Sequence, residues 1–365
     1  MLRISLNKDS YFEDQVVSGT VTFEPRMDIC LYDIYIKLRA FEYFMTIEEN
    51  GQTISDLNNY QILQKSLDIH TVLKTSKKDS YSVKSVSYQF PFEFNIPKDL
   101  APSFEFPQIK KRASLRYIIT VEVSSNSLSP VTEEYLFIKA RPKLTSSQLR
   151  NEAKCNIKNA GFISRGESKL ALIMNKNNII MGDNIPFTAE IDNERCGVNI
   201  KEIKVTVART VTFKKNGAEY PLRNIIIKKI YPVKVLKNSR GSFSYDDICM
   251  KDSNLKDFKY SRELNPYPNR VDDLNMLMPT MCSKLITCEY SLKISCYFDL
   301  SVLSKDRTRI IVPLYIAHQT PMEYESEKSG NNLTNNNYGN SNYNNNYGNN
   351  NYNNNYGNNN YINNY

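Results

Sequence analysis

The sequence predicts an all-β protein built from two tandem antiparallel β-sandwiches, and three observations lead to that prediction. Two stretches of alternating apolar and polar side chains flank a proline-marked segment between residues 88 and 123. A period of two is typical of a strand with one buried face, and a strand, a crossing and a second strand join the two sheets of a sandwich. Helical periodicity is scarce, and the strand pattern of the first half of the chain returns near residue 180.

The N-terminal stretch is predicted to form three strands. Apolar and polar residues alternate from Leu2 to Leu6, and a turn at Asp14 leads into a second alternating stretch around Gly19. Asp adopts the left-handed backbone conformation of a tight turn more readily than most residues. A longer strand follows. The residues assigned to the inward faces are Leu2, Ile4, Leu6, Val17, Val21, Phe23, Ile34, Ile36 and Leu38.

The central stretch contains the strongest strand signal. Phenylalanines alternate with polar residues and proline over 90–96, which predicts a strand with a buried aromatic face. Three prolines then interrupt regular structure, so residues 97–114 are predicted to cross between the sheets in an extended conformation. The strand at 115–123 follows, with Tyr117 on its inward face.

The second half of the chain repeats this arrangement. Gly182 takes the place of Asp14 in a turn before an alternating strand, and Tyr290, like Tyr117, lies in a strand after a proline-marked loop. A repeat of about 170 residues is too long for a solenoid unit and favours two related sandwiches. The predicted domains are residues 1–145 and 160–320, joined by a polar linker at 144–158.

From residue 321 to residue 365 the composition changes to Asn, Tyr and Gly, and NNNYG recurs at 335, 344 and 353. Such a tract has too few apolar side chains to offset the entropy lost on ordering, so it is predicted to be disordered. Tyrosine stacking and asparagine ladders make self-association one hypothesis for this tail, and a neutral low-complexity expansion is the alternative.

The residue types of common catalytic and metal sites are sparse. Two histidines and seven cysteines without CxxC spacing favour neither a zinc site nor a nucleophile–base pair. Cys288 and Cys296 share the inward parity of one strand and are predicted to be buried thiols. The glycine spacing of Gly161–Gly166 is followed by Glu-Ser where a phosphate-binding loop requires Lys-Ser or Lys-Thr. No enzymatic activity, cofactor or metal is therefore expected.

Charge and hydropathy argue against nucleic acid as a partner and against secretion or a membrane span. The net charge of +8 arises largely from cations that alternate with apolar residues on strands, such as Lys37 and Lys204, and no nucleic-acid-binding module is visible. Nucleic acid is not a predicted partner. The first residues lack the apolar core of a secretory signal, and no apolar stretch approaches the roughly 18 residues of a membrane span. We expect a cytosolic protein.

Several stretches of the sequence resemble the arrestin family. The central one is FPFEFNIPKDLAPSFEF, a basic turn and then YIITVEV, and SYFEDQVVSGTVTFE resembles the first turn and strand of the family's N-terminal lobe. The stretch from SKLALIM to IKVTVARTVTF resembles the opening of its second lobe, and KLITCEYSLKISCYF and VPLYIAHQTP resemble the last strands of that lobe.

This resemblance implies an arrestin fold, in which both sandwiches are immunoglobulin-like. It also implies a non-enzymatic cytosolic adaptor that binds cytoplasmic segments of membrane proteins, couples them to endocytosis or sorting machinery, and is recruited to the plasma membrane or to endosomes. Two other readings stay open: a structural subunit of a retromer-like coat, and a scaffold that assembles through the Asn/Tyr-rich tail.

The functional residues of receptor-type arrestins are mostly missing, so the resemblance is closer to α-arrestins and retromer-type proteins. The paired phosphate-sensing lysines have no counterpart apart from Lys8, and residues 134–139 contain no arginine for a polar latch. No Pro-Pro dipeptide occurs, so recruitment of a ubiquitin ligase through PPxY is not expected.

A basic cluster is the predicted site for cargo or an anionic membrane surface. Three adjacent cations cannot all be buried in a sandwich, so at least two of Lys110, Lys111 and Arg112 are predicted to face solvent. Lys8 and Lys139 belong to the same lobe and are predicted to extend this positive face. The alternative is a solvated turn that only caps the strand.

Overall fold

The computed structural model describes residues 1–47, 50–107, 111–127, 129–142, 149–159, 163–250, 278–299 and 307–318. These residues all belong to one compact unit, Met1–Thr320. Almost all their regular structure is β-strand, and the single helix among them, α1 (Ile69–Val72), is one turn long. The predicted all-β fold class is confirmed. The Asn/Tyr-rich tail lies outside the described residues.

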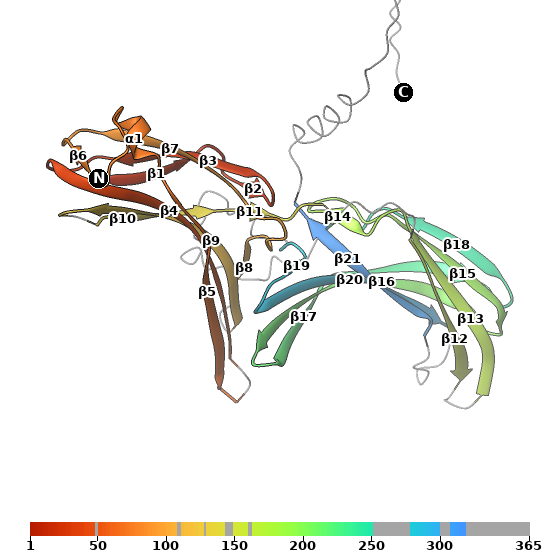
Figure 1. The fold of residues 1–365 in the computed structure, drawn as a ribbon. Coiled ribbons are helices and arrows are strands. Elements are labelled where there is room, and N and C mark those ends of the chain that lie inside the picture. The colour runs from red at the N-terminus through yellow and green to blue at the C-terminus, as the bar shows by residue number, and fades with distance from the viewer. Residues whose placement is uncertain are drawn as a thin grey trace, which may run out of the picture. The chain divides into compact units, whose positions relative to one another are not determined.

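The strands up to residue 142, which we call the first lobe, form two facing sheets and a short pair (Figure 1). One sheet has the order β1-β3-β7 and consists of β1 (Leu2–Leu6), β3 (Val16–Phe23) and β7 (Tyr88–Asn95). The other has the order β10-β9-β4-β5 and consists of β4 (Ile29–Ile47), β5 (Thr53–Ser66), β6 (Tyr81–Val83), β8 (Phe104–Pro107), β9 (Lys111–Ser125) and β10 (Val131–Leu136). The pair is β2 (Tyr11–Phe12) with β11 (Ile138–Lys139).

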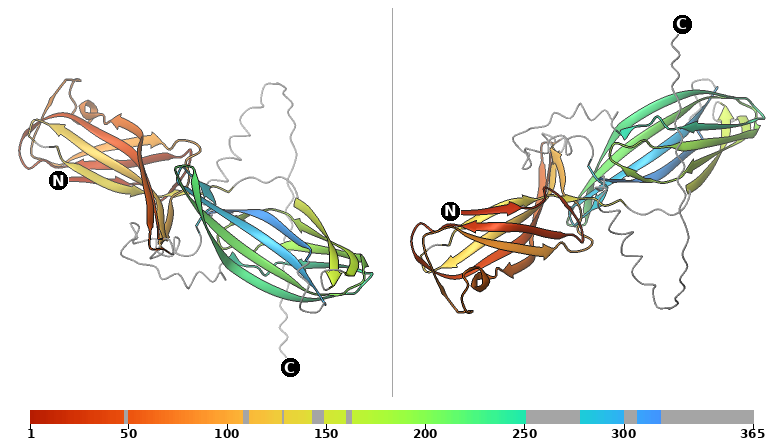
Figure 2. Two further views of the ribbon diagram at one scale, coloured as in Figure 1. Left: turned by 90° about the horizontal axis from the view of Figure 1, so that it is seen from below. Right: turned by 90° about the horizontal axis from the view of Figure 1, so that it is seen from above.

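The strands from residue 149 to residue 318, the second lobe, also form two sheets. One has the order β12-β13-β15-β18 and consists of β12 (Leu149–Asn159), β13 (Ile163–Met174), β15 (Phe187–Cys196) and β18 (Arg240–Tyr245). The other has the order β14-β21-β20-β16-β17 and consists of β14 (Asn178–Ile180), β16 (Ile200–Lys215), β17 (Ala218–Val235), β19 (Met281–Cys282), β20 (Ile286–Phe298) and β21 (Arg309–Ala317). Figure 2 shows these sheets from two further sides.

The internal duplication is visible in the turns that the sequence singled out. Asp14 has φ 62° and Gly182 has φ 94°, so both adopt the left-handed conformation expected for them. Each turn follows a short strand that pairs in parallel with the last strand of its lobe. In the first lobe Tyr11 lies opposite Ile138, and in the second lobe Ile179 lies opposite Ile316.

A hydrogen-bonded corner is also repeated. The Tyr117 hydroxyl donates to the carbonyl of Ala101, and the Tyr290 hydroxyl donates to that of Met278, both at 2.6 Å. Two residues after each of these carbonyls, a side-chain hydroxyl accepts a hydrogen bond from a backbone N–H of the last strand of the lobe. The bonds are Ile138 N to Ser103 Oγ at 2.9 Å and Ile316 N to Thr280 Oγ1 at 2.8 Å. Each bond fixes an otherwise irregular proline-marked loop against a sheet.

Two expectations about connecting segments were wrong. Residues 149–158, predicted as linker, are nearly all of β12, which pairs antiparallel with β13. The half-buried face of β12 has only weakly apolar side chains such as Ala153 and Cys155. The alternation of apolar and polar residues that predicts a strand is therefore weak here. The predicted crossing at 97–114 contains a strand, β8, because Pro107 lies at its end, where a missing N–H is tolerated. The predicted domain limits at 145 and 160 stay a prediction.

The two lobes contact each other through the β4–β5 hairpin and the strands β16 and β20. The rings of Phe44 and Phe213 stack with centroids 5.2 Å apart. Glu42 is completely buried and accepts hydrogen bonds from the backbone N–H groups of Leu285 at 2.8 Å and Ile286 at 3.0 Å. These donors compensate part of the cost of removing a carboxylate from water.

The cysteines are all free thiols, and Cys288 and Cys296 are fully buried as predicted. Burial raises the pKa of each of these two to about 12, so both are protonated at neutral pH. Among the described residues there is no helix of sufficient length and hydrophobicity to cross a bilayer.

Candidate functional site

The structure places the predicted basic residues in two separate regions of the first lobe. Lys111 and Arg112 begin β9, opposite Thr46 and Met45 of β4, and Lys110 lies outside the described residues. The exposed Lys8 precedes β2, and the half-buried Lys139 on β11 lies opposite Phe12. Lys139 follows shortly after Leu136, the last residue of β10, which pairs with Tyr117 of β9. Tyr117 is six residues along β9 from Lys111, or about 20 Å at 3.4 Å per residue, so Lys111 and Lys139 are far apart. Their role in binding stays a prediction.

Lys111 lines a cleft between the tips of two hairpins. The cavity has a volume of about 540 Å³. Its first-lobe residues are Lys111, Thr46, Ile47 and Asn50, and its second-lobe residues are Phe213, Glu219, Tyr220, Pro221 and Leu222. Apolar walls with one cation and one acid at the rim suit a short peptide segment, whose apolar side chains enter the cleft while its polar groups stay at the edge.

A second group of cations lies on the outer face of the sheet β14-β21-β20-β16-β17. Lys293 on β20 is its centre. Its neighbours are Lys204 on β16, Arg223 and Lys228 on β17, Arg309 at the start of β21, and Arg307 just before that strand. Partial burial, reinforced by the charges of Arg309, Arg223, Lys204 and Arg307, lowers the pKa of Lys293. None of the six forms an ion pair with an acid of the described residues. We call them the Lys293 cluster.

The register shows how the cluster is assembled. In one row across the sheet, Thr206 lies between Lys228 and Lys293. In the next, Ser295 lies between Lys204 and Arg309. Adjacent strands are about 4.8 Å apart, so cations on alternate strands are close enough to repel each other and to attract one anion together.

Aromatic and aliphatic side chains complete this face. Arg307 lies over the ring of Tyr297, 4.2 Å from its centroid, and donates to its hydroxyl at 2.7 Å. Three isoleucines of the same face are more than half exposed: Ile225 (58%), Ile230 (51%) and Ile311 (55%). Exposed apolar side chains among unpaired cations are typical of a surface that contacts lipid, because headgroups attract the cations while the apolar groups reach the interface.

The two histidines have structural roles. His318 is buried, its Nδ1 accepts from the Ala140 N–H at 2.9 Å, and burial together with the charge of Lys139 lowers its pKa to about 3. His70 lies 2.6 Å from Asp68, the residue that caps α1. Among the described residues, no three His, Cys, Asp or Glu side chains are placed to hold a metal ion together.

Sequence reasoning missed the Lys293 cluster. Lys204 fits the pattern of a cation that alternates with apolar residues on a strand, and the sequence does not link it to the other five. The cluster draws on strands that are up to 105 positions apart, from residue 204 to residue 309. The one signal that could have found it is the set of cations at outward positions of several strands, in which Lys204, Lys228, Lys293 and Arg309 have no acid in their rows.

Comparison with known proteins gives matches along most of the chain. Residues 2–139 match the family model "Arrestin (or S-antigen), N-terminal domain", and residues 164–321 match "Arrestin (or S-antigen), C-terminal domain". The chain is also similar to the Arrestin domain-containing protein A of Dictyostelium discoideum, with 21% identity over 242 residues. That match covers 62% of this chain and only 40% of the length of the relative.

Proposed function

Because this chain belongs to the arrestin family, we propose that it is a non-enzymatic adaptor that docks on anionic membrane surfaces through the Lys293 cluster. In this position it binds a cytoplasmic segment of a membrane protein in the cleft beside Lys111. The observation that carries the proposal is the group of six cations without an acid partner among the described residues, interspersed with exposed isoleucines.

A lipid surface suits this face better than a single phosphorylated residue does. The cations extend over β16, β17, β20 and β21, so several headgroups contact them at once. Each cation near an anionic membrane contributes about 1 kcal/mol of binding free energy. The isoleucines contribute only if a partner buries apolar surface, which headgroups and acyl chains do.

The cleft supports the adaptor part of the proposal. It is formed by the tip of the β4–β5 hairpin and by the β16–β17 hairpin, and its walls are Phe213, Pro221 and Leu222. An extended segment from a membrane protein reaches such a cleft while the adaptor lies at the same membrane. Location in the cytoplasm, recruitment to the plasma membrane or endosomes, and coupling to endocytosis or sorting are parts of this proposal.

Flotation with phospholipid vesicles tests the proposal. We expect the full chain to bind vesicles that contain phosphatidylserine, and the triple variant Lys204→Ala/Lys293→Ala/Arg309→Ala to lose on the order of 100-fold in affinity. The loss should shrink as ionic strength rises, because salt screens exposed charges. Circular dichroism checks that the variant is folded.

A matched control removes the same charge elsewhere. Lys8→Ala/Lys111→Ala/Arg112→Ala tests the patch that the sequence predicted, and it should leave vesicle affinity within about twofold. If this control loses binding while the cluster variant keeps it, the membrane-binding face is on the first lobe. If neither variant changes the affinity, the protein does not dock through cations, and a coat subunit held by protein contacts becomes the better reading.

A further inference from the structure

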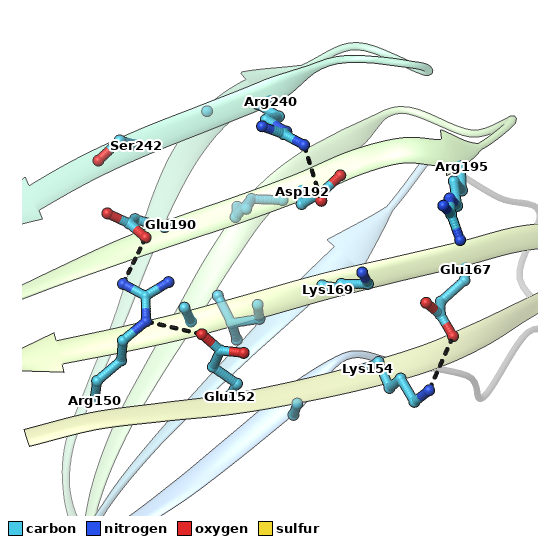
Figure 3. A pocket seen from close by; sticks show the side chains of 15 residues that line it. Arg150, Glu152, Lys154, Glu167, Lys169, Glu190, Asp192, Arg195, Arg240 and Ser242 are labelled. Atoms are coloured by element: carbon cyan, nitrogen blue, oxygen red, sulfur yellow. Dashed lines mark hydrogen bonds and ion pairs between the residues drawn. The ribbon is translucent and has the colours of Figure 1, made fainter.

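The second lobe carries a hollow on the outer face of its other sheet, β12-β13-β15-β18, away from the Lys293 cluster and the cleft (Figure 3). The hollow has a volume of about 1020 Å³. One row across the sheet contains Glu152, Ala171, Glu190 and Ser242, so long and small side chains alternate from strand to strand. The small side chains leave the hollow open between the long charged ones.

A β-bulge turns two charged side chains into this groove. Glu167 pairs with Arg195 and Lys169 pairs with Asp192, so β15 has one more residue than β13 between these two pairs. Asp192 and Arg195 therefore face the same side although they are three positions apart. Gly166, at φ 101°, permits the close approach of β15, since a Cβ there would lie 1.8 Å from the Arg195 carbonyl oxygen.

The acids in the groove are already paired. Arg150 bridges Glu152 at 2.8 Å and Glu190 at 2.9 Å. Lys154 lies 3.7 Å from Glu167, and Arg240 lies 3.6 Å from Asp192. These contacts are the dashed lines of Figure 3.

Two cations of the groove, Lys169 and Arg195, have no ion-pair partner among the described residues, and both are exposed. Figure 3 shows them at the same end of the hollow, beside Glu167. Lys169 also has Lys154 as its cross-strand neighbour, and this like charge raises the cost of leaving Lys169 without an anion. The spare charge of the groove is therefore positive and confined to one end.

The opposite end of the groove has both apolar and polar side chains. The row beyond Ala171 contains Arg150, Ile173, Thr188 and Ser244. A second hollow of about 330 Å³ there is lined by Ile173, Pro186, Phe187 and Tyr245 together with Asn175, Thr188, Ser244 and Asp246. Along β13 the distance from Glu167 to Ile173 is about 20 Å at 3.3 Å per residue. An extended peptide of six or seven residues spans such a distance.

We propose that this groove binds an extended, aspartate- or glutamate-rich segment of a partner protein. A carboxylate of the segment lies between Lys169 and Arg195, and an aliphatic or aromatic side chain enters the hollow at Ile173 and Tyr245. Two carboxylates of the segment balance the two spare charges of Lys169 and Arg195, since Glu167 and Asp192 are already paired with Lys154 and Arg240. Phosphoserine is the alternative anion, and the peptide pools described below distinguish the two. A flat anionic membrane does not fit, because Glu152 and Glu190 also belong to this face.

Binding of labelled peptides to the full chain tests the assignment. The probes are four pools of fluorescein-labelled ten-residue peptides that share an aliphatic residue near one end and carry glutamate, serine, lysine or phosphoserine at two positions near the other. Fluorescence anisotropy should rank the glutamate pool first. Lys169→Ala/Arg195→Ala should weaken that pool about tenfold, as expected for the loss of two exposed charge contacts.

The matched control is Lys234→Ala/Lys237→Ala, which removes two exposed cations of the same lobe outside the groove, and it should leave peptide affinity unchanged. Vesicle flotation of the Lys169/Arg195 variant should match the unsubstituted chain, so this test is independent of the proposed membrane function. The assignment is overturned if no pool binds, if the phosphoserine or serine pool binds as well as the glutamate pool, or if the variant and the unsubstituted chain bind equally.

Discussion

The two lobes share one fold but use charge differently at equivalent positions. Five residues after the corner tyrosine, the first lobe has Glu122 and the second has Ser295. Glu122 accepts ion pairs from Lys37 and Arg39, whereas Ser295 lies opposite Lys204, which has no acid partner among the described residues. At this position the first lobe pairs its sheet cations internally, and the second lobe leaves Lys204 available for a ligand.

The strand next to each corner shows the same contrast. Glu105 of β8 pairs with Arg116, the residue just before Tyr117. The matching residues of the second lobe are Cys282 and Glu289, which form no such pair. The contact with Glu105 occupies the Arg116 side chain, whereas a cation without such a partner is available to bind a ligand. Equivalent positions in a duplicated fold thus separate structural charges from candidate functional ones.

The largest expected effect concerns Glu105, a buried acid of the first lobe whose matching position in the second lobe is Cys282. Burial, partly opposed by Arg116, raises the pKa of Glu105 to about 7. Between an unfolded value of about 4.3 and this folded value, the native state holds a proton that the unfolded state has lost. Stability should therefore fall as pH rises from about 4.5 to 7, by at most about 1.4 kcal/mol per pH unit, and become flat above that range.

Urea unfolding of the full chain at several pH values measures this slope. Glu105→Gln should remove the contribution of this group, while Cys282→Ala at the matching position of the second lobe should leave the slope as it is. An identical pH dependence in the chain with Glu105 and in the glutamine variant would show that Glu105 is ionised throughout.

An intermediate effect is expected at the corner tyrosines. Tyr117→Phe removes the hydroxyl that donates to Ala101 and should cost about 1 kcal/mol. Tyr290→Phe should cost more, about 2–3 kcal/mol, because its hydroxyl also hydrogen-bonds the buried Arg209 guanidinium. The free energy of unfolding from urea titration compares the two. Equal losses would mean that the Arg209 contact adds nothing and that the corners are energetically the same.

The smallest effect is expected when Glu122 of the first lobe and Ser295 of the second lobe are each replaced by the residue found at the matching position of the other lobe. Ser295→Glu gives Lys204 and Arg309 the acid that the first lobe already has, so vesicle affinity should fall by about 1 kcal/mol, roughly fivefold. Ser295 is buried, so urea unfolding checks that the variant keeps its fold. Glu122→Ser leaves Lys37 and Arg39 unpaired and should lower stability by about 0.5–1 kcal/mol without weakening vesicle binding. Ser295→Gln introduces a side chain of about the same size as glutamate but without its charge, so it distinguishes the effect of the charge from the effect of the added volume. Unchanged flotation of Ser295→Glu would remove this row from the membrane-binding face.

The sequence by itself determined the fold class, the duplication and the residues that mark it. Alternation over 90–96 and the turns at Asp14 and Gly182 are local properties, because side-chain periodicity and backbone preference act over a few residues. Tyr117 and Tyr290 were recognisable for the same reason, since each follows a proline-marked loop in an alternating strand.

Only the tertiary structure decided which charges lie together. Lys204, Lys293 and Arg309 are neighbours because of the register of β16, β20 and β21, which is set by pairing between residues far apart in the chain. The bulge that brings Arg195 to the same face as Lys169 is equally non-local, since it depends on how β15 lies against Gly166. Conversely, Lys110, Lys111 and Arg112 attracted notice only because they are adjacent in sequence. Neighbouring residues of a strand point to opposite faces of the sheet. A cluster of side chains on one face therefore comes from several strands rather than from consecutive residues of one strand.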